Sequence, residues 1–139
     1  MKEKSKEDYL RTMFSMYERL DSKKDGITSI SIAKELKITR PSVSGMLKKL
    51  AEKNFIKFKP YSKIFFTSKG LKEAQRVMHN HRVIEVFLKK ILKYDLSKVH
   101  EEAHRLEHAF SEDSINGLDK FLNNPTRSPS GYDIPHNSK

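Results

Sequence analysis

The sequence has no cysteine and no apolar run approaching the ~18 residues that a membrane-spanning helix needs. Without thiolates, any bound metal would depend on nitrogen and oxygen ligands. The first ten residues, MKEKSKEDYL, lack the apolar core of a signal peptide. These absences predict a cytoplasmic protein with no membrane partner. A length of 139 residues fits one domain or two small ones that share an interface.

Acidic residues are scarce in the middle of the chain. Residues 34–82 contain 13 basic and 3 acidic groups, a net charge of +10, whereas residues 1–33 have a net charge of +1 and residues 83–139 of −1. A generically lysine-rich protein would spread its charge more evenly. The concentrated charge therefore predicts a surface that binds a polyanion such as nucleic acid.

The basic segment has the sequence pattern of a winged helix. Apolar residues at helical spacing predict a helix over residues 5–20, a short helix from Thr28, and a helix from Pro41 with Thr39 as its N-cap. The last two helices, joined by a short turn, form a helix-turn-helix. Two strands, Phe55–Pro60 and Lys63–Thr67, then follow around a turn at Tyr61 and Ser62. The alternative is a small helical domain whose hairpin only covers the core.

A histidine-rich stretch, VHEEAHRLEH at residues 99–108, is the strongest chemical feature of the chain. In a helix, His100, His104, Glu107 and His108 fall on one face. Imidazole and carboxylate without thiolate suit a borderline divalent ion: Fe(II), Mn(II), Zn(II), Co(II) or Ni(II). A long helix from Thr67 or Ser68 to about Leu92 adds His81 and Glu85 at i, i+4, which could form a second part of the site.

Two other interpretations of this stretch remain open. It could be a solvated helix face, as charged runs often are. Residues 104–108 also spell HxxEH, the zinc motif of inverted metalloproteases. His79 lies at a different helical angle from His81, and we interpret it as a surface or DNA-side residue.

The chain is thus expected to be mostly α-helical with a small β-hairpin. The predicted parts are a winged helix-turn-helix over residues 1–70, a helical metal-binding and dimerisation domain over residues 71–123, and an extended tail over residues 124–139 with little to bury. The apolar faces of Val86–Leu92 and Ile115–Leu122 are expected to form a dimer contact, unless they pack on each other within one chain.

Six segments give the sequence a specific resemblance to a known family: DYLRTMF, TRPSVSGMLKKL, FTSKG, HRVIEVFL, KVHEEAHRLEH and RSPSGYDIP. In this order they resemble the metal-dependent repressors, which include the diphtheria toxin repressor, the iron-dependent repressors and the manganese transport regulator. The resemblance implies a homodimer, loaded with Fe(II) or Mn(II), that represses metal-homeostasis genes. Zn(II), Co(II) or Ni(II) could substitute in vitro. It implies metal ligands at Asp8, His81, Glu85, His100, His104, Glu107 and His108.

The chain departs from the family pattern in three respects: the residue at position 104, the combination of Asp8 with Arg11, and the length. His104 stands where iron-type members carry cysteine and manganese-type members carry glutamate. Asp8 matches the manganese type, and Arg11 the iron type. The sequence also ends soon after the proline-rich segment, so no SH3-like domain is expected, and an ion at His81, Glu85 and His100 would complete its shell from nearby side chains or water.

The winged-helix pattern also predicts how double-stranded DNA would be contacted. Residues around the start of the second helix of the motif would reach base edges in the major groove: Thr39, Arg40, Pro41, Ser42 and Ser44. Lysines on that helix and on the hairpin would contact phosphates: Lys48, Lys49, Lys57, Lys59 and Lys63. A two-fold homodimer on a pseudo-palindromic operator is the usual arrangement. The other classes kept open are a metal-independent DNA-binding regulator and a zinc peptidase; we expect no enzyme and no small-molecule substrate.

Overall fold

The computed structural model describes residues 3–59 and 63–136. The chain divides into two compact units, Met1–Gln75 and Arg76–Lys139. The division falls within one long helix, α4 (Ser68–Lys90), which begins in the first unit and ends in the second. Among the described residues, no helix combines the length and the hydropathy required to cross a membrane.

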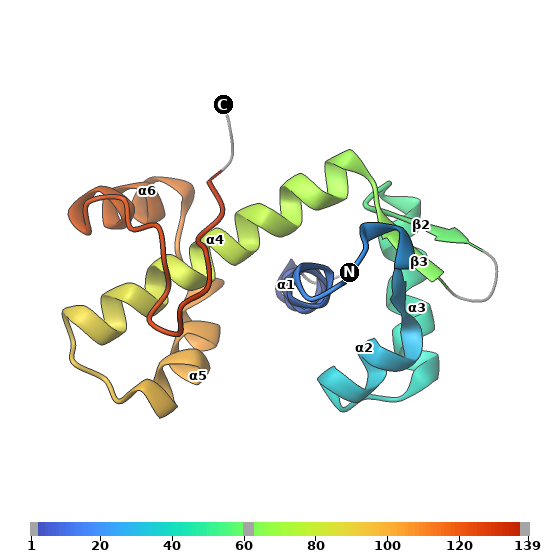
Figure 1. Cartoon of the computed structure of the whole chain (residues 1–139), viewed down its shortest axis with the longest axis horizontal. Coiled ribbons are helices and arrows are strands. Elements are labelled where there is room, and N and C mark those ends of the chain that lie inside the picture. Colours follow the sequence, from blue (N-terminus) through green and yellow to red (C-terminus); the bar gives the residue numbers. More distant parts are fainter. Residues whose placement is uncertain (1–2, 60–62, 137–139) are drawn as a thin grey trace. The chain divides into compact units, whose positions relative to one another are not determined.

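The first unit is a winged helix-turn-helix, as predicted. Its elements are α1 (Glu3–Glu18), the 3-10 turn η1 (Lys23–Asp25), β1 (Ile27–Thr28), α2 (Ser29–Leu36), α3 (Arg40–Glu52), β2 (Ile56–Lys59), β3 (Lys63–Phe66) and the start of α4. Figure 1 shows α2 and α3 joined by a short turn and followed by the β2–β3 hairpin. The predicted turn at Tyr61 and Ser62 lies outside the described residues.

The sheet contains a third strand that the sequence analysis missed. The strand order is β1-β3-β2, all antiparallel, with Ile27 of β1 opposite Ile64 of β3. Strand β1 has only two residues and follows Gly26, whose φ of 75° favours glycine. A strand this short has no detectable alternation of apolar and polar residues. Only its pairing with β3 identifies it as a strand.

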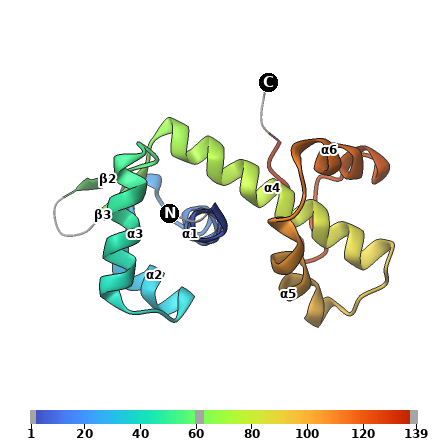
Figure 2. The ribbon, with the colours of Figure 1, turned by 180° about the vertical axis from the view of Figure 1, so that it is seen from behind.

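Helix α3 begins and packs as its sequence indicates. The hydroxyl of Thr39 accepts a hydrogen bond from the backbone N–H of Ser42 (3.3 Å), and Pro41 lies in the first turn. Val43, Leu47 and Leu50 are buried on one face, so the opposite face is left to solvent. Figure 2 shows α3 from the other side, between α2 and the hairpin.

The second unit packs the end of α4 against α5 (Leu96–Glu107), α6 (Glu112–Phe121) and the C-terminal segment, residues 122–136. Its core joins apolar side chains from all four parts: Val83, Ile84, Val86, Leu88, Val99, Ala103, Ile115 and Ile134. Most of the two faces expected to form a dimer contact therefore pack within the chain. Ile91, Leu92 and Phe121 remain exposed, Phe121 to 65%.

The C-terminal segment differs from the extended tail that was expected. Ile134 is only 4% exposed and packs into the core of the second unit. Its backbone N–H donates to the carbonyl of Thr126 (2.9 Å), and Ser128 donates in the same way to Tyr132 (2.8 Å). Arg82 of α4 donates to the carbonyl of Asp133 (2.7 Å). One buried side chain and these hydrogen bonds shape a segment whose composition alone indicates disorder.

Candidate metal centre and nucleic-acid interface

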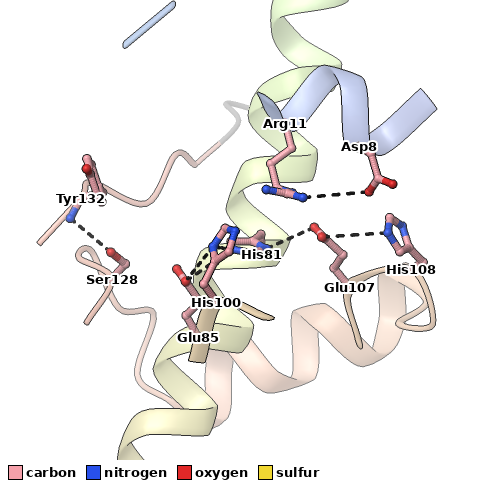
Figure 3. Close-up of polar contacts among 9 residues, drawn as sticks. All are labelled: Asp8, Arg11, His81, Glu85, His100, Glu107, His108, Ser128 and Tyr132. Atoms are coloured by element: carbon pink, nitrogen blue, oxygen red, sulfur yellow. Dashed lines mark hydrogen bonds and ion pairs between the residues drawn. The ribbon is translucent and has the colours of Figure 1, made fainter. Parts of the chain in front are cut away.

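Helices α4 and α5 bring His81, Glu85 and His100 together. His81 and Glu85 lie one turn apart on α4, with Nε2 of His81 3.4 Å from Oε2 of Glu85. Nδ1 of His100, on α5, lies 3.1 Å from Nε2 of His81 and 3.6 Å from Oε2 of Glu85. Figure 3 shows the three side chains turned toward one another. His81 and Glu85 are buried, whereas the His100 side chain is 67% exposed, so the set is open on one side.

Glu107 lies between this set and a second one. Its Oε2 is 3.3 Å from Nδ1 of His81, and its Oε1 is 4.0 Å from Nε2 of His108. Figure 3 shows Glu107 between the two imidazoles. The His104 and His108 rings are 5.6 Å apart, and ligand atoms of His104, Glu107 and His108 lie within 4.8 Å of one another. The predicted residues of α5 and its C-cap thus divide between two adjoining sets. His100 belongs to the first set, and His104, Glu107 and His108 form the second.

Burial and charge act on these groups in opposite directions. Burial lowers the pKa of His81, but hydrogen bonds and charges from Glu107 and Glu85 outweigh it, and the net pKa is raised above 6.5. Burial likewise raises the pKa of Glu85, but His100 and His81 outweigh it and bring the pKa down to about 2. The buried carboxylate is therefore charged at neutral pH and offers an anionic oxygen beside two imidazoles.

Asp8, which the family resemblance adds as a ligand, lies on α1 in the first unit. Its Oδ1 is 4.0 Å from Nη2 of Arg11, one turn along the helix (Figure 3). Its participation in a metal site stays a prediction.

The donor set of the second unit fits a borderline divalent ion. Imidazole nitrogen suits Fe, Zn and Ni, carboxylate oxygen suits Mn, and no thiolate is present. His81, Glu85 and His100 would hold one ion, and His104, Glu107 and His108 a second. Glu101 and Glu102 are instead engaged by Arg105 on the same helix, at 3.4 and 2.8 Å. The solvated-face interpretation of the stretch therefore applies to these two glutamates.

The predicted DNA-contacting residues all belong to the first unit. The exposed ones are Thr39, Arg40, Pro41, Ser42, Ser44, Lys48, Lys49, Lys57 and Lys63. Lys59 lies on β2 opposite Lys63, and its side chain is outside the described part of the chain. Gly45 of α3 is also exposed, and a Cβ built there would meet nothing within 4 Å.

His79 is not placed as the sequence analysis proposed. It belongs to the second unit and is half-buried, with Nε2 3.0 Å from Oδ2 of Asp119 on α6. Helical spacing correctly separated it from His81. The spacing could not find its partner, because Asp119 is 40 residues away in the sequence.

Comparison with known proteins identifies the family. Residues 1–64 match the iron-dependent repressor N-terminal DNA-binding domain, and residues 67–136 match the iron-dependent repressor metal-binding and dimerisation domain. The chain belongs to the iron-dependent repressor family. Both halves of this repressor-family chain are matched, in the order in which the two units occur.

Named relatives agree with this assignment. The chain is 35% identical over 131 residues to the iron-dependent repressor IdeR of Mycobacterium tuberculosis, covering 93% of this chain and 54% of IdeR. It is 33% identical to an uncharacterised helix-turn-helix regulator of Methanocaldococcus jannaschii, covering 84% of this chain and 90% of that one. The solved structure of the manganese regulator SloR superposes with a TM-score of 0.80 at 37% identity, covering 94% of this chain and 59% of SloR. The chain thus spans little more than half of IdeR and SloR.

The pKa shifts predict how the stability of the metal-free second unit depends on pH. Glu85, with its lowered pKa, contributes stability above its ordinary pKa of 4.5, and this is lost as the pH falls toward about 2. His81, with its raised pKa, contributes below its ordinary 6.5, and this is lost as the pH rises through the raised value. The free energy of unfolding of the metal-free unit should therefore be greatest between pH 4.5 and pH 6.5. Urea unfolding with chelator at each pH measures it, and Glu85→Gln should remove the loss on the acidic side.

Proposed function

We propose that this protein is a metal-dependent transcriptional repressor that binds operator DNA as a homodimer when loaded with Fe(II) or Mn(II). The observation that carries the proposal is the combination of two features within one family member. One is an exposed, basic helix-turn-helix with a wing, and the other is a pair of adjoining imidazole and carboxylate sets on α4 and α5. Neither feature alone would support a repressor that binds DNA in response to metal.

The regulatory step depends on ligands from two units. Asp8 is proposed to join His104, Glu107 and His108 around one ion, while His81, Glu85 and His100 hold the other. A ligand shifts a conformational equilibrium only by its differential affinity for the two states. In the proposed mechanism, Asp8 and the α5 ligands converge in one state only, so the ion favours that state and orients the DNA-binding units. The ion's charge also offsets the repulsion among the carboxylates.

Dimerisation is proposed to use the exposed apolar side chains of the second unit. Three exposed apolar residues occur where α4 ends and α5 begins: Ile91, Leu92 and Leu96. Phe121 at the end of α6 is more exposed still. Apolar groups of this size are usual at the centre of a dimer contact. Sedimentation of the wild type and of Leu92→Glu tests the assignment.

Operator binding with and without metal tests the function. Fluorescence anisotropy on an operator selected from random DNA should show tight binding with Mn(II) or Fe(II) and weak binding after chelation. Equal affinity in both conditions would leave the metal-independent regulator as the explanation. Peptide hydrolysis by the zinc-loaded protein would instead support the HxxEH peptidase.

Specific and non-specific contacts should separate by mutation. Arg40→Ala removes a long donor from the start of α3 and should change the preferred base at its position, costing about 1–3 kcal/mol. Ser42→Ala should change sequence preference less, because the hydroxyl already accepts a hydrogen bond from Thr39 (2.9 Å). Binding-site selection on both variants measures this. A larger change of preference in Ser42→Ala would reverse the assignment of the two residues.

Salt dependence provides the matched control for that experiment. Lys57→Gln, on the wing, should weaken binding uniformly across sequences and reduce the slope of log affinity against log salt by about 1. If Lys57→Gln changed the preferred sequence instead, the lysine would be reading bases and not phosphates.

A further inference from the structure

A third cluster of possible metal ligands lies in the second unit, apart from the two regulatory sets. It consists of His79 on α4, Asp119 on α6 and His136 in the C-terminal segment, and ligand atoms of the three lie within 4.8 Å of one another. They line an open cleft of about 450 Å³. The cluster therefore joins three parts of the unit that are far apart in the sequence.

Both ring nitrogens of His79 lie within hydrogen-bond distance of side-chain oxygens. Its Nδ1 lies 2.9 Å from Oδ1 of Asn80, and its Nε2 lies 3.0 Å from Oδ2 of Asp119. With Nδ1–H donating to Asn80, the Nε2 lone pair faces the carboxylate of Asp119. A cation placed there would bind the lone pair and pair with the carboxylate, as a second proton on the imidazole also would. Metal-bound histidines are usually held this way through their other nitrogen.

The second oxygen of Asp119 independently indicates a cation. Oδ1 is buried and accepts no hydrogen bond from any residue that the structure describes. A buried carboxylate oxygen without a donor costs free energy, because it has lost its water and gained no partner. A positive ion against the carboxylate would supply the missing interaction, although Arg76 and Lys120 also line the cleft.

His136 completes the set with a second imidazole. Its Nε2 lies 3.2 Å from the carbonyl oxygen of Pro125, so Nε2–H donates there and the lone pair remains on Nδ1. The rings of His79 and His136 are 5.2 Å apart. Ligands of a tetrahedral zinc site are separated by about 3.3 Å at the usual Zn–N and Zn–O lengths. The 3.0 Å between His79 and Asp119 is close to that value.

We propose that His79, Asp119 and His136 form a third metal site, which takes a zinc-class divalent ion and fastens the C-terminal segment to α4 and α6. Two imidazoles and one carboxylate bind Zn(II) more tightly than Mn(II) or Fe(II). Three protein ligands leave a fourth position for water. The site is separate from the proposed regulatory sets, and its occupation does not depend on DNA binding.

Metal stoichiometry tests the site. Equilibrium dialysis of the full chain against Zn(II), followed by elemental analysis, should give one more zinc per chain for the wild type than for His136→Ala or Asp119→Asn. Glu112→Gln is the matched control, because it removes a negative charge from the same cleft without removing a proposed ligand. Equal zinc content in the wild type and His136→Ala would overturn the site, as would loss of the extra zinc in Glu112→Gln.

Hydrogen exchange tests the fastening. With Zn(II), exchange at the backbone amides of Ser128 and Ile134 should slow by at least 10-fold in the wild type and remain unchanged in His136→Ala. Because His136 is exposed, its replacement leaves the core intact, and circular dichroism verifies this. Unchanged exchange in the wild type would refute the fastening role. A protein that keeps the extra zinc but shows no metal-dependent operator binding would refute the proposed function and leave this site standing.

Discussion

Gly70→Ala is expected to destabilise the winged helix by at least about 3 kcal/mol. Gly70 lies in the first turn of α4, and a Cβ built there overlaps the carbonyl oxygen of Phe55. The overlapping atoms belong to the backbone, so no rotation of a side chain can relieve the contact. Since domains are stable by only about 5–15 kcal/mol, the loss is a large fraction of the total.

The close approach at Gly70 is held by several hydrogen bonds. The backbone N–H of Thr67 donates to Phe55 (3.1 Å), and the Thr67 hydroxyl donates to the carbonyl of Asn54 (2.6 Å) and accepts from Gly70 N–H (2.9 Å). The start of α4 is thus bound to the segment that leads from α3 into the wing. Moving α4 away to admit a methyl group would break these contacts.

Gly45→Ala is the matched control for this prediction. It makes the same substitution in a helix of the same unit, where a Cβ meets nothing within 4 Å. Alanine favours a helix interior by about 1 kcal/mol over glycine, so this variant should be slightly more stable than the wild type. Urea unfolding of both variants measures the difference. If Gly70→Ala unfolded at the same urea concentration as Gly45→Ala, the inference that α4 lies too close to the Phe55 backbone to admit a methyl group would be contradicted.

Local patterns predicted much of the first unit because its elements carry their own boundaries. Thr39 and Pro41 mark the start of α3, and the spacing of Val43, Leu47 and Leu50 defines its buried face. The missed strand β1 has no such local pattern. Its two residues pair with β3, about 36 residues later, so only the tertiary structure defines it.

The second unit illustrates the same limit for its chemistry. The i, i+4 spacing predicted His81 with Glu85, and the face containing His104 and His108, because both relations are fixed within one helix. The contact between Glu107 and His81 depends on how α5 packs against α4. The contact of His79 with Asp119 and the burial of Ile134 depend on α6 and the C-terminal segment in the same way. Composition predicted an extended tail with little to bury, because composition does not show that the single side chain of Ile134 is buried.

Glu107→Gln is expected to weaken metal binding more than any other single isosteric change in the second unit. One carboxylate oxygen faces His81 of the first set, and the other faces His108 of the second. The amide keeps the size of the side chain but removes the charge from both. We expect the affinity for the ion held with His104 and His108 to fall by at least about 100-fold, and that for the ion held by His81 by about 10- to 100-fold, the range for a change outside the ligand shell. Metal-dependent operator binding should be lost with it.

Two further glutamates make this prediction specific. Glu85→Gln should weaken only the ion held with His81 and His100, because Glu85 contacts no member of the second set among the described contacts. Glu102→Gln, on the same helix as Glu107, should leave both ions bound, because Glu102 pairs with Arg105. Titration calorimetry with Mn(II) and Zn(II) on the three variants separates these outcomes. Two ions bound at wild-type affinity by Glu107→Gln would show that the Glu107 carboxylate neither binds metal nor supports metal binding through His81.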